Sequence, residues 1–141
     1  MGLIVTLEVP AQVPNLAVIR HFVEETAAAF GAGRDAIEDV LQAVDETAVN
    51  IIVHGYGDQP GSSEVQVVKE NGTLVVRLRD HAPLFDPTLV PPPDLTTPLE
   101  ERRMGGLGLH LARHFVDSVT YRTTSEGGNE LTLLKKVSWI P

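Results

Sequence analysis

The sequence predicts an α+β sandwich, in which a mixed β-sheet is covered on one face by three helices. Apolar runs at helical spacing are separated by pairs of β-rich runs, which is the pattern of a sheet with helices packed on it. The order along the chain is strand, helix, helix, two strands, long loop, helix, two strands. At 141 residues the chain suits one domain, residues 1–141, and no stretch has the composition of an interdomain linker.

The first half of the chain holds a strand and two helices. The run LIVTLEVP at 3–10 is typical of a strand that a proline closes. Apolar residues on one side of 15–30 predict a helix, and two glycines follow its end. A second helix is predicted from a cap at Asp35 to about His54, because one apolar stripe continues along it.

The second half holds two hairpins and one more helix. Asn71-Gly72 between β-rich runs at 64–69 and 73–79 is a strong hairpin signal. The stretch after Asp80 is rich in proline and lacks periodicity, which is typical of a functional or mobile loop. The remaining predicted elements are a helix at 107–117 and strands at 118–124 and 130–137.

Composition excludes several kinds of protein. The absence of cysteine excludes disulfides, thiolate metal sites and cysteine nucleophiles, and the scattered histidines lack the spacing of a zinc site. A net charge of -8 argues against nucleic-acid binding and favours protein partners. The N-terminus resembles neither a signal peptide nor an anchor, and no apolar run approaches the roughly 20 residues that span a bilayer. We therefore expect a cytoplasmic protein that binds no membrane.

Three clusters carry candidate chemistry, and the first lies on the second helix. Glu46, Asn50 and His54 are four residues apart, so they are expected to share one face. Such a face can simply be solvated. It can also hold a magnesium–nucleotide complex, because a carboxylate can deprotonate a nucleophile and an amide oxygen one turn away can ligate a hard cation. Asp45 points elsewhere on the helix, and its role stays open.

The other two clusters flank the long loop. Asp80 ends an apolar strand, where its carboxylate can accept a hydrogen bond from an exocyclic amine such as that of adenine, or can simply end the strand. The third cluster consists of Gly105, Gly106, Leu107, Gly108 and Leu109. Glycines before a helix suit a phosphate cradle, although a flexible helix start would look the same. The run is neither a Walker A loop nor a Rossmann fingerprint.

In this order, the three clusters resemble the N, G1 and G2 boxes of the GHKL ATPases, which include gyrase and the histidine kinases. The chain is most similar to the anti-sigma-factor serine/threonine kinases of that superfamily, on three further motifs. These are HGY at 54–56, FDP at 85–87 and GGLGLHLA at 105–112. The resemblance covers nearly the whole chain and implies a Bergerat fold.

The resemblance also implies roles for individual residues. Glu46 would be the general base, Asn50 the magnesium ligand, and Asp80 the acceptor for the adenine amino group. Residues 87–104 would form an ATP lid, from which Thr96, Thr97, Arg102 and Arg103 reach phosphate. The implied nucleotide-binding set is Asn50, Asp80, Ala82, Thr97, Arg103, Gly105, Gly106, Leu107, Gly108 and Leu109.

One position departs from the family pattern. The G1 box usually reads Asp-x-Gly, and here Ala82 stands in place of the glycine. Because an alanine adds a methyl group and resists positive φ, we expect a narrower adenine pocket or a different turn. ATP binding would be weakened rather than lost.

The function implied is an ATP- and Mg²⁺-dependent protein kinase that doubles as an anti-sigma factor. Its substrate would be a STAS-type anti-anti-sigma protein, and its second partner a sigma factor. Family members commonly form homodimers, for which the apolar face of the first helix is available, and Arg20 matches a partner-contacting position. The alternatives are a non-catalytic interaction module and a histidine-kinase ATP domain cut from a larger protein. The second alternative is disfavoured because no helix carries a phospho-acceptor histidine, and we expect His21 and His114 to be structural.

Overall fold

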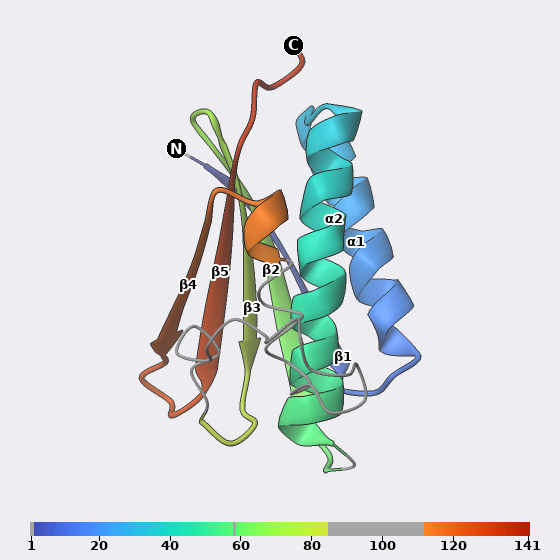
Figure 1. Cartoon of the computed structure of the whole chain (residues 1–141), viewed down its shortest axis with the longest axis vertical. Helices are drawn as coiled ribbons and strands as arrows, with labels where there is room; N and C mark the ends of the chain where they lie inside the picture. Colours follow the sequence, from blue (N-terminus) through green and yellow to red (C-terminus); the bar gives the residue numbers. More distant parts are fainter. Residues whose placement is uncertain (1, 58, 85–111) are drawn as a thin grey trace, which may run out of the picture.

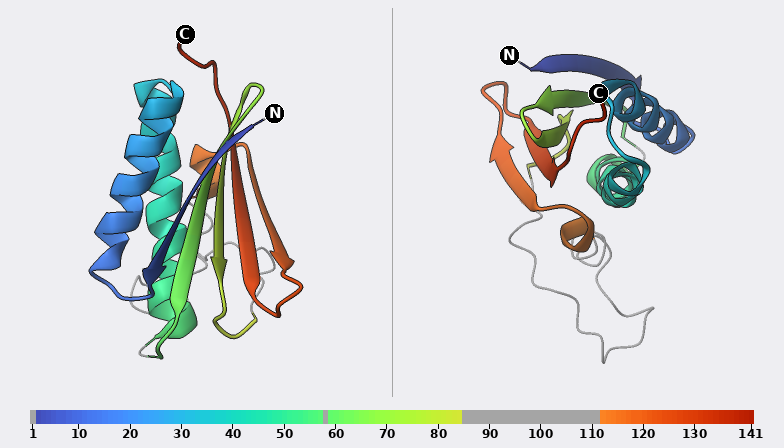
Figure 2. Two further views of the ribbon diagram at one scale, coloured as in Figure 1. Left: turned by 180° about the vertical axis from the view of Figure 1, so that it is seen from behind. Right: turned by 90° about the horizontal axis from the view of Figure 1, so that it is seen from above.

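A computed structural model describes residues 2–57, 59–84 and 112–141, and it confirms the predicted sandwich (Figure 1). A five-stranded sheet with the order β1-β2-β3-β5-β4 is covered on one face by helices (Figure 2). The elements are β1 (Leu3–Pro10), α1 (Asn15–Phe30), α2 (Arg34–Val49), the π-helix η1 (Asn50–Tyr56), β2 (Ser62–Glu70), β3 (Thr73–Asp80), β4 (Ser118–Thr123) and β5 (Asn129–Lys136). Of the third predicted helix, residues 112–117 are described, and the helix ends at residue 115 rather than at Asp117. No helix in the described ranges is both long and apolar enough to cross a membrane.

The sequence predicts a mixed sheet, but this prediction is wrong. All four pairs of neighbouring strands in the described residues are antiparallel. Two of these pairs, β2–β3 and β4–β5, are joined by short turns and are antiparallel for that reason. Between β1 and β2 the chain crosses the sheet twice, once as α1 and once as α2 (Figure 2). After an even number of crossings the chain is back at the end of the sheet where β1 finished. The last residue of β1, Pro10, accordingly lies opposite the first residue of β2, Ser62.

The second helix differs from its prediction at both ends. It begins at Arg34, with Gly33 as its N-cap, so Asp35 is not the cap. Asp35 lies in the first turn instead, where its charge favours the positive end of the helix dipole. The α-helix then ends at Val49, and a π-helix continues to Tyr56 rather than stopping near His54.

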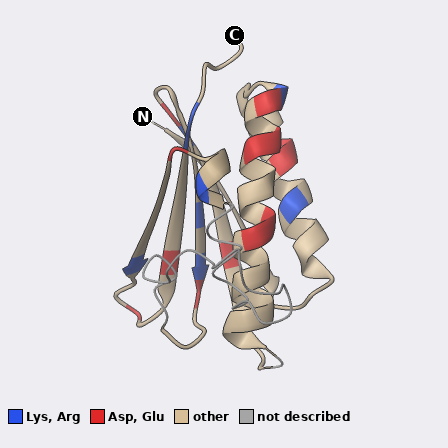
Figure 3. Ribbon diagram, in the orientation of Figure 1, with Lys and Arg blue, Asp and Glu red and all other residues tan. Residues whose placement is uncertain are grey.

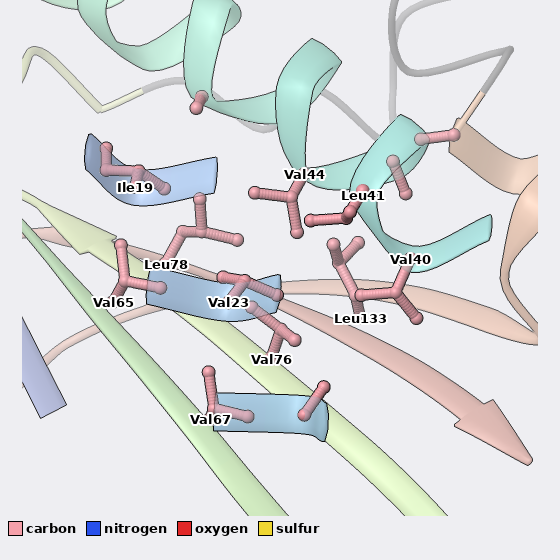
Figure 4. Packing of buried hydrophobic residues seen from close by; sticks show 14 of the residues in the cluster. Ile19, Val23, Val40, Leu41, Val44, Val65, Val67, Val76, Leu78 and Leu133 are labelled. Carbon is pink, nitrogen blue, oxygen red and sulfur yellow. The ribbon is translucent and has the colours of Figure 1, made fainter. Parts of the chain in front are cut away.

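The core lies between the helices and one face of the sheet (Figure 4). The labelled side chains that meet there are Ile19, Val23, Val40, Leu41, Val44, Val65, Val67, Val76, Leu78 and Leu133. All of them are at most 1% exposed, and burying each one fully stabilises the fold by about 1.5–3 kcal/mol. The apolar stripe of α2 therefore sets how the helix lies on the sheet, which fixes the direction of its polar face.

The opposite face of the sheet carries a row of charged residues, one from each strand. The register aligns Glu8, Glu64, Arg79, Glu130 and Arg122 across β1, β2, β3, β5 and β4. Acidic and basic residues alternate across β2, β3, β5 and β4 in the lower part of the sheet in Figure 3, whereas Glu8 on β1 lies beside another acidic residue, Glu64. Glu130 is only 3% exposed and accepts hydrogen bonds from both arginines beside it. These bonds hold the pKa of Glu130 below its usual value, with Arg122 as the largest cause.

Candidate functional site

Glu46 is the one residue whose buried side-chain polar atom lacks a partner in the described part of the chain. Its Oε2 makes no hydrogen bond there. Burial raises the pKa of Glu46, and repulsion from Asp45 raises it further. A buried carboxylate oxygen without a partner costs stability, and a raised pKa suits a group that takes up a proton. Glu46 therefore has the environment of a general base.

The neighbouring Asp45 points to the first helix. Arg20 on α1 forms an ion pair with the Asp45 carboxylate, and both side chains are about two-fifths exposed, at 42% and 40%. Burial raises the pKa of Asp45, while Arg20 acts against this increase. The role that the sequence left open for Asp45 is thus a link between α1 and α2, next to Glu46.

Asn50 remains one α-turn from Glu46, as predicted, and His54 lies in the π-helix that follows. The N–H of Asn50 donates to the carbonyls of Glu46 and Thr47, and Asn50 is also the first residue of η1. A π-helix bonds i to i+5 and so holds an extra residue in each turn. His54 lies within this π-helix and is exposed.

Asp80 is buried at the end of β3, with an exposure of 5%. Its Oδ1 accepts hydrogen bonds from the N–H of Ala82 at 2.9 Å and from Nδ2 of Asn129 at 2.8 Å. Burial raises the pKa of Asp80, and these hydrogen bonds partly oppose the increase. Within the described residues both bonds go to Oδ1, so Oδ2 is the oxygen left to accept from a ligand.

Asn129 and Tyr121 are the site residues that sequence reasoning missed. Asn129 holds both ends of the Asp80 turn, because its Nδ2 also donates to the carbonyl of Ala82 at 3.1 Å. The hydroxyl of Tyr121 donates to Oδ1 of Asn129 at 2.5 Å and fixes the amide orientation. The sequence offered only a turn ending at Asn129. Its closeness to Asp80 comes from the β3–β5 register, which no local pattern reveals.

Ala82 does not adopt the backbone conformation that the glycine pattern suggested. No residue other than glycine has a positive φ in the described ranges, so the alanine introduces no strain of that kind. Its methyl group is buried and faces η1, since a Cβ built on Gly55 would lie 3.3 Å from the Cβ of Ala82. The methyl group thus packs against the π-helix, and the end of β3 lies next to the helix that begins at Asn50.

The predicted phosphate-binding residues lie outside the described residues, together with the predicted lid at 87–104. They are Thr96, Thr97, Arg102, Arg103, Gly105, Gly106, Leu107, Gly108 and Leu109. Contacts from Gly55 and Tyr56 place the π-helix that begins at Asn50 against the Asp80 turn.

A cavity of about 370 Å³ lies at the same end of the sheet, on the charged face. Its described lining includes Glu64, Arg79, Asp80 and Arg122, but neither Glu46 nor Asn50. Both arginines donate hydrogen bonds to glutamates of the charged face. This cavity is therefore separate from the polar face of α2.

No group of three or more acidic or histidine side chains in the described ranges could hold a metal ion. Magnesium typically keeps several waters and binds one or two protein oxygens together with substrate phosphates. The donor set around Glu46 and Asn50 therefore fits a magnesium ion that arrives with a nucleotide, and does not form a protein-only metal cage.

An α+β sandwich with an acid–amide pair on one helix and a buried aspartate at a strand end defines a nucleotide-binding domain of the ATPase type. The chain belongs to the histidine kinase-like ATPase domain family, whose profile matches residues 9–135. It is 28% identical over 119 residues to the serine-protein kinase RsbW of Bacillus cereus (strain AH820) and to that of Bacillus thuringiensis (strain Al Hakam). These alignments cover 82% of this chain and 74% of each relative.

The fold is also that of a solved structure. The crystal structure of the RsbU and RsbW domains of a Mycobacterium tuberculosis protein matches with a TM-score of 0.61 at 19% identity. The match covers 99% of this chain and 33% of that one, so this chain spans a third of the length of its structural relative.

Proposed function

We propose that this protein is an ATP-dependent serine/threonine kinase and an anti-sigma factor, which phosphorylates a STAS-type anti-anti-sigma protein and sequesters a sigma factor. The observation that carries the proposal is the buried Oε2 of Glu46, which has no partner among the described residues and lies one helical turn before Asn50. The similarity to the RsbW serine-protein kinases supports it. On the same family grounds, we propose a cytoplasmic homodimer.

In this proposal each described residue has one chemical task. Glu46 accepts the proton of the partner's serine or threonine hydroxyl. The oxygen of this hydroxyl forms the new bond to the γ-phosphorus, while the bond from that phosphorus to the bridging oxygen of ATP breaks and ADP leaves. The amide oxygen of Asn50 ligates magnesium, and Oδ2 of Asp80 accepts from the adenine amino group. Bound magnesium ATP would supply the transferable phosphoryl group and the charge neutralisation that such transfers require.

The proton acceptor is suited to this task by its surroundings. Because burial and Asp45 both raise the pKa of Glu46, the carboxylate is more basic than an exposed glutamate. A base is most effective when its pKa lies near the working pH. Positioning of the hydroxyl beside this base, and not covalent chemistry by the protein, would supply most of the rate enhancement.

Calorimetric titration with ATP and magnesium tests the proposal, on the wild type, Asn50→Ala and Glu46→Gln. We expect saturable binding by the wild type, loss of that binding in Asn50→Ala, and binding without phosphotransfer in Glu46→Gln. Gln42→Ala, an exposed change on the same helix, is the matched control and should bind like the wild type. Absence of wild-type binding at millimolar ATP would contradict the proposal.

A phosphotransfer assay on candidate STAS proteins separates the kinase from the non-catalytic alternative. The kinase transfers phosphate to a serine or threonine of the partner, and Glu46→Gln abolishes the transfer. Binding of ATP without transfer to any partner that the protein binds would favour an interaction module of the same fold.

A further inference from the structure

Tyr56 is the last residue of η1, and its hydroxyl joins two strands of the sheet. The hydroxyl donates to the carbonyl of Ser62 at 2.7 Å and accepts from the N–H of His81 at 2.6 Å. Ser62 is the first residue of β2, and His81 directly follows the end of β3. The described pairing of these strands ends at Ser63 and Asp80. The hydroxyl therefore links the next pair of residues, Ser62 and His81, beyond the last paired residues.

The position of this hydroxyl depends on the π-helix. The side chain of Tyr56 is 6% exposed, and its ring lies against Gly61, where any Cβ would collide with it. The extra residue in each π-turn shifts the following side chains around the helix axis relative to an α-helix. Continuation of α2 as a regular helix would therefore direct the residue at position 56 elsewhere. Asn50, the proposed magnesium ligand, begins the same π-helix.

The hydrogen bond to His81 acts on Asp80 through the backbone. The N–H of His81 belongs to the peptide that joins it to Asp80, and peptide groups are planar. Holding this N–H therefore fixes ψ of Asp80 and the direction in which the chain leaves β3. Asn129 and Ala82 then hold Oδ1 of the carboxylate, as described above. Two independent sets of contacts thus fix the backbone and the side chain of Asp80.

The geometry points to Tyr56 as a positioning residue for base recognition: through His81 it aims Oδ2 of Asp80 at the 6-amino group of a bound adenine nucleotide. This inference rests on the proposed function and deepens it, because it concerns which base the site selects. Gly55, next to Tyr56, packs against Ala82 at the other side of the same turn. The π-helix thereby connects the proposed magnesium ligand to the proposed base-binding carboxylate.

The experiment compares ATP with purine riboside triphosphate, which differs from ATP only in lacking the 6-amino group. Dissociation constants for both are measured calorimetrically, with magnesium, on the wild type and Tyr56→Phe. We expect the wild type to prefer ATP by about tenfold or more, the effect of one hydrogen bond to a charged group. Tyr56→Phe should lower this preference about tenfold through weaker ATP binding, while its affinity for the analogue stays within about twofold of that of the wild type.

Trp139→Phe is the matched control. It also removes a hydrogen bond from an aromatic side chain to a backbone carbonyl, that of Glu70, but it does so at the other end of the sheet. We expect it to keep the wild-type preference for ATP. If Tyr56 had a purely structural role, Tyr56→Phe would weaken the binding of ATP and of the analogue equally. The inference is overturned if the variant keeps the wild-type preference for ATP, or if both affinities fall by the same factor.

The hydrogen exchange of the His81 amide in the wild type provides a measurement that does not depend on a variant folding. The amide should exchange at least about tenfold more slowly than an exposed amide, because the Tyr56 hydroxyl holds it. Exchange at the exposed rate overturns the inference. If the wild type binds neither nucleotide, the proposed function fails as well. If it binds ATP and Tyr56→Phe keeps the full preference, only the inference about Tyr56 fails.

Discussion

Replacing Glu46 with glutamine should stabilise the protein, although it removes the proposed catalytic base. Oε2 of Glu46 is buried without a partner among the described residues. Leaving a polar group unsatisfied costs about 1–3 kcal/mol and more when the group is charged, so the neutral amide of the variant costs less than the carboxylate. Glutamine keeps the shape, removes the buried charge and ends the repulsion from Asp45. Because the side chain is only half-buried, we expect a gain of about 1–2 kcal/mol, from the lower part of that range. In a domain of this size, this gain raises Tm by about 3–6 °C.

The gain should depend on pH in a defined direction. The pKa of Glu46 is raised above its ordinary value of 4.5 in the folded protein, so the folded state binds this proton more tightly than the unfolded state. The penalty for the charged form is therefore absent below the unfolded pKa. It grows as the pH rises through the interval up to the folded pKa, and is complete above it. Urea denaturation of both proteins at pH 8 and pH 4 measures the difference.

Glu38→Gln is the matched control on the same helix. The side chain of Glu38 is 61% exposed and pairs with Arg34, so its replacement should change stability by no more than about 0.5 kcal/mol. The reasoning is refuted if Glu46→Gln is no more stable than the wild type at pH 8. It is also refuted if the gain persists unchanged at pH 4, because a charge that is absent cannot be its cause.

Three further predictions concern the sheet and the Asp80 turn. Asn129→Ala removes a donor to Asp80, so it should cost about 1–2 kcal/mol in urea denaturation and weaken ATP binding about tenfold in calorimetry; unchanged ATP affinity would contradict it. Glu130→Gln should cost about 1–3 kcal/mol at pH 7. Since the pKa of Glu130 is lowered, its contribution is lost as the pH falls through the folded pKa, and acid titration should show a smaller loss of stability in the variant. Ala82→Gly should lower stability by about 1–2 kcal/mol, because the unfolded chain gains freedom and the buried contact of the methyl group with η1 is lost, and it should leave ATP affinity unchanged; tighter binding would show that the methyl group does narrow the pocket.

The order and type of the elements could be predicted because they depend on neighbours in the sequence. Strand β1 and helix α1 begin and end at the predicted residues, 3–10 and 15–30, since a period of two or of 3.6 is visible in any short window. The Asn71-Gly72 turn joins β2 to β3, and Gly72 has the positive φ of 69° that such turns require. The one-turn spacing of Glu46 and Asn50 is local for the same reason, and it survives in the structure.

The strand directions and the π-helix could not be predicted in this way. The antiparallel pairing of β1 with β2 depends on how two helices between them pack, and the pattern of apolar residues continues smoothly through Asn50 into η1. Propensity alone does not favour a π-turn. Two contacts accompany the π-helix in the structure. The hydroxyl of Tyr56 is held between Ser62 and His81, and Gly55 fits closely against Ala82.

The sequence by itself determined the layers of this protein and the residue types at its candidate site: a carboxylate and an amide on one helix, and an aspartate at a strand end. Only the tertiary structure decided which residues complete the site. Asn129 reaches Asp80 across 49 positions, and Arg20 reaches Asp45 across 25. Such contacts follow from strand register and from helix packing, which depend on burying the whole core at once. A pattern within one segment carries no information about either.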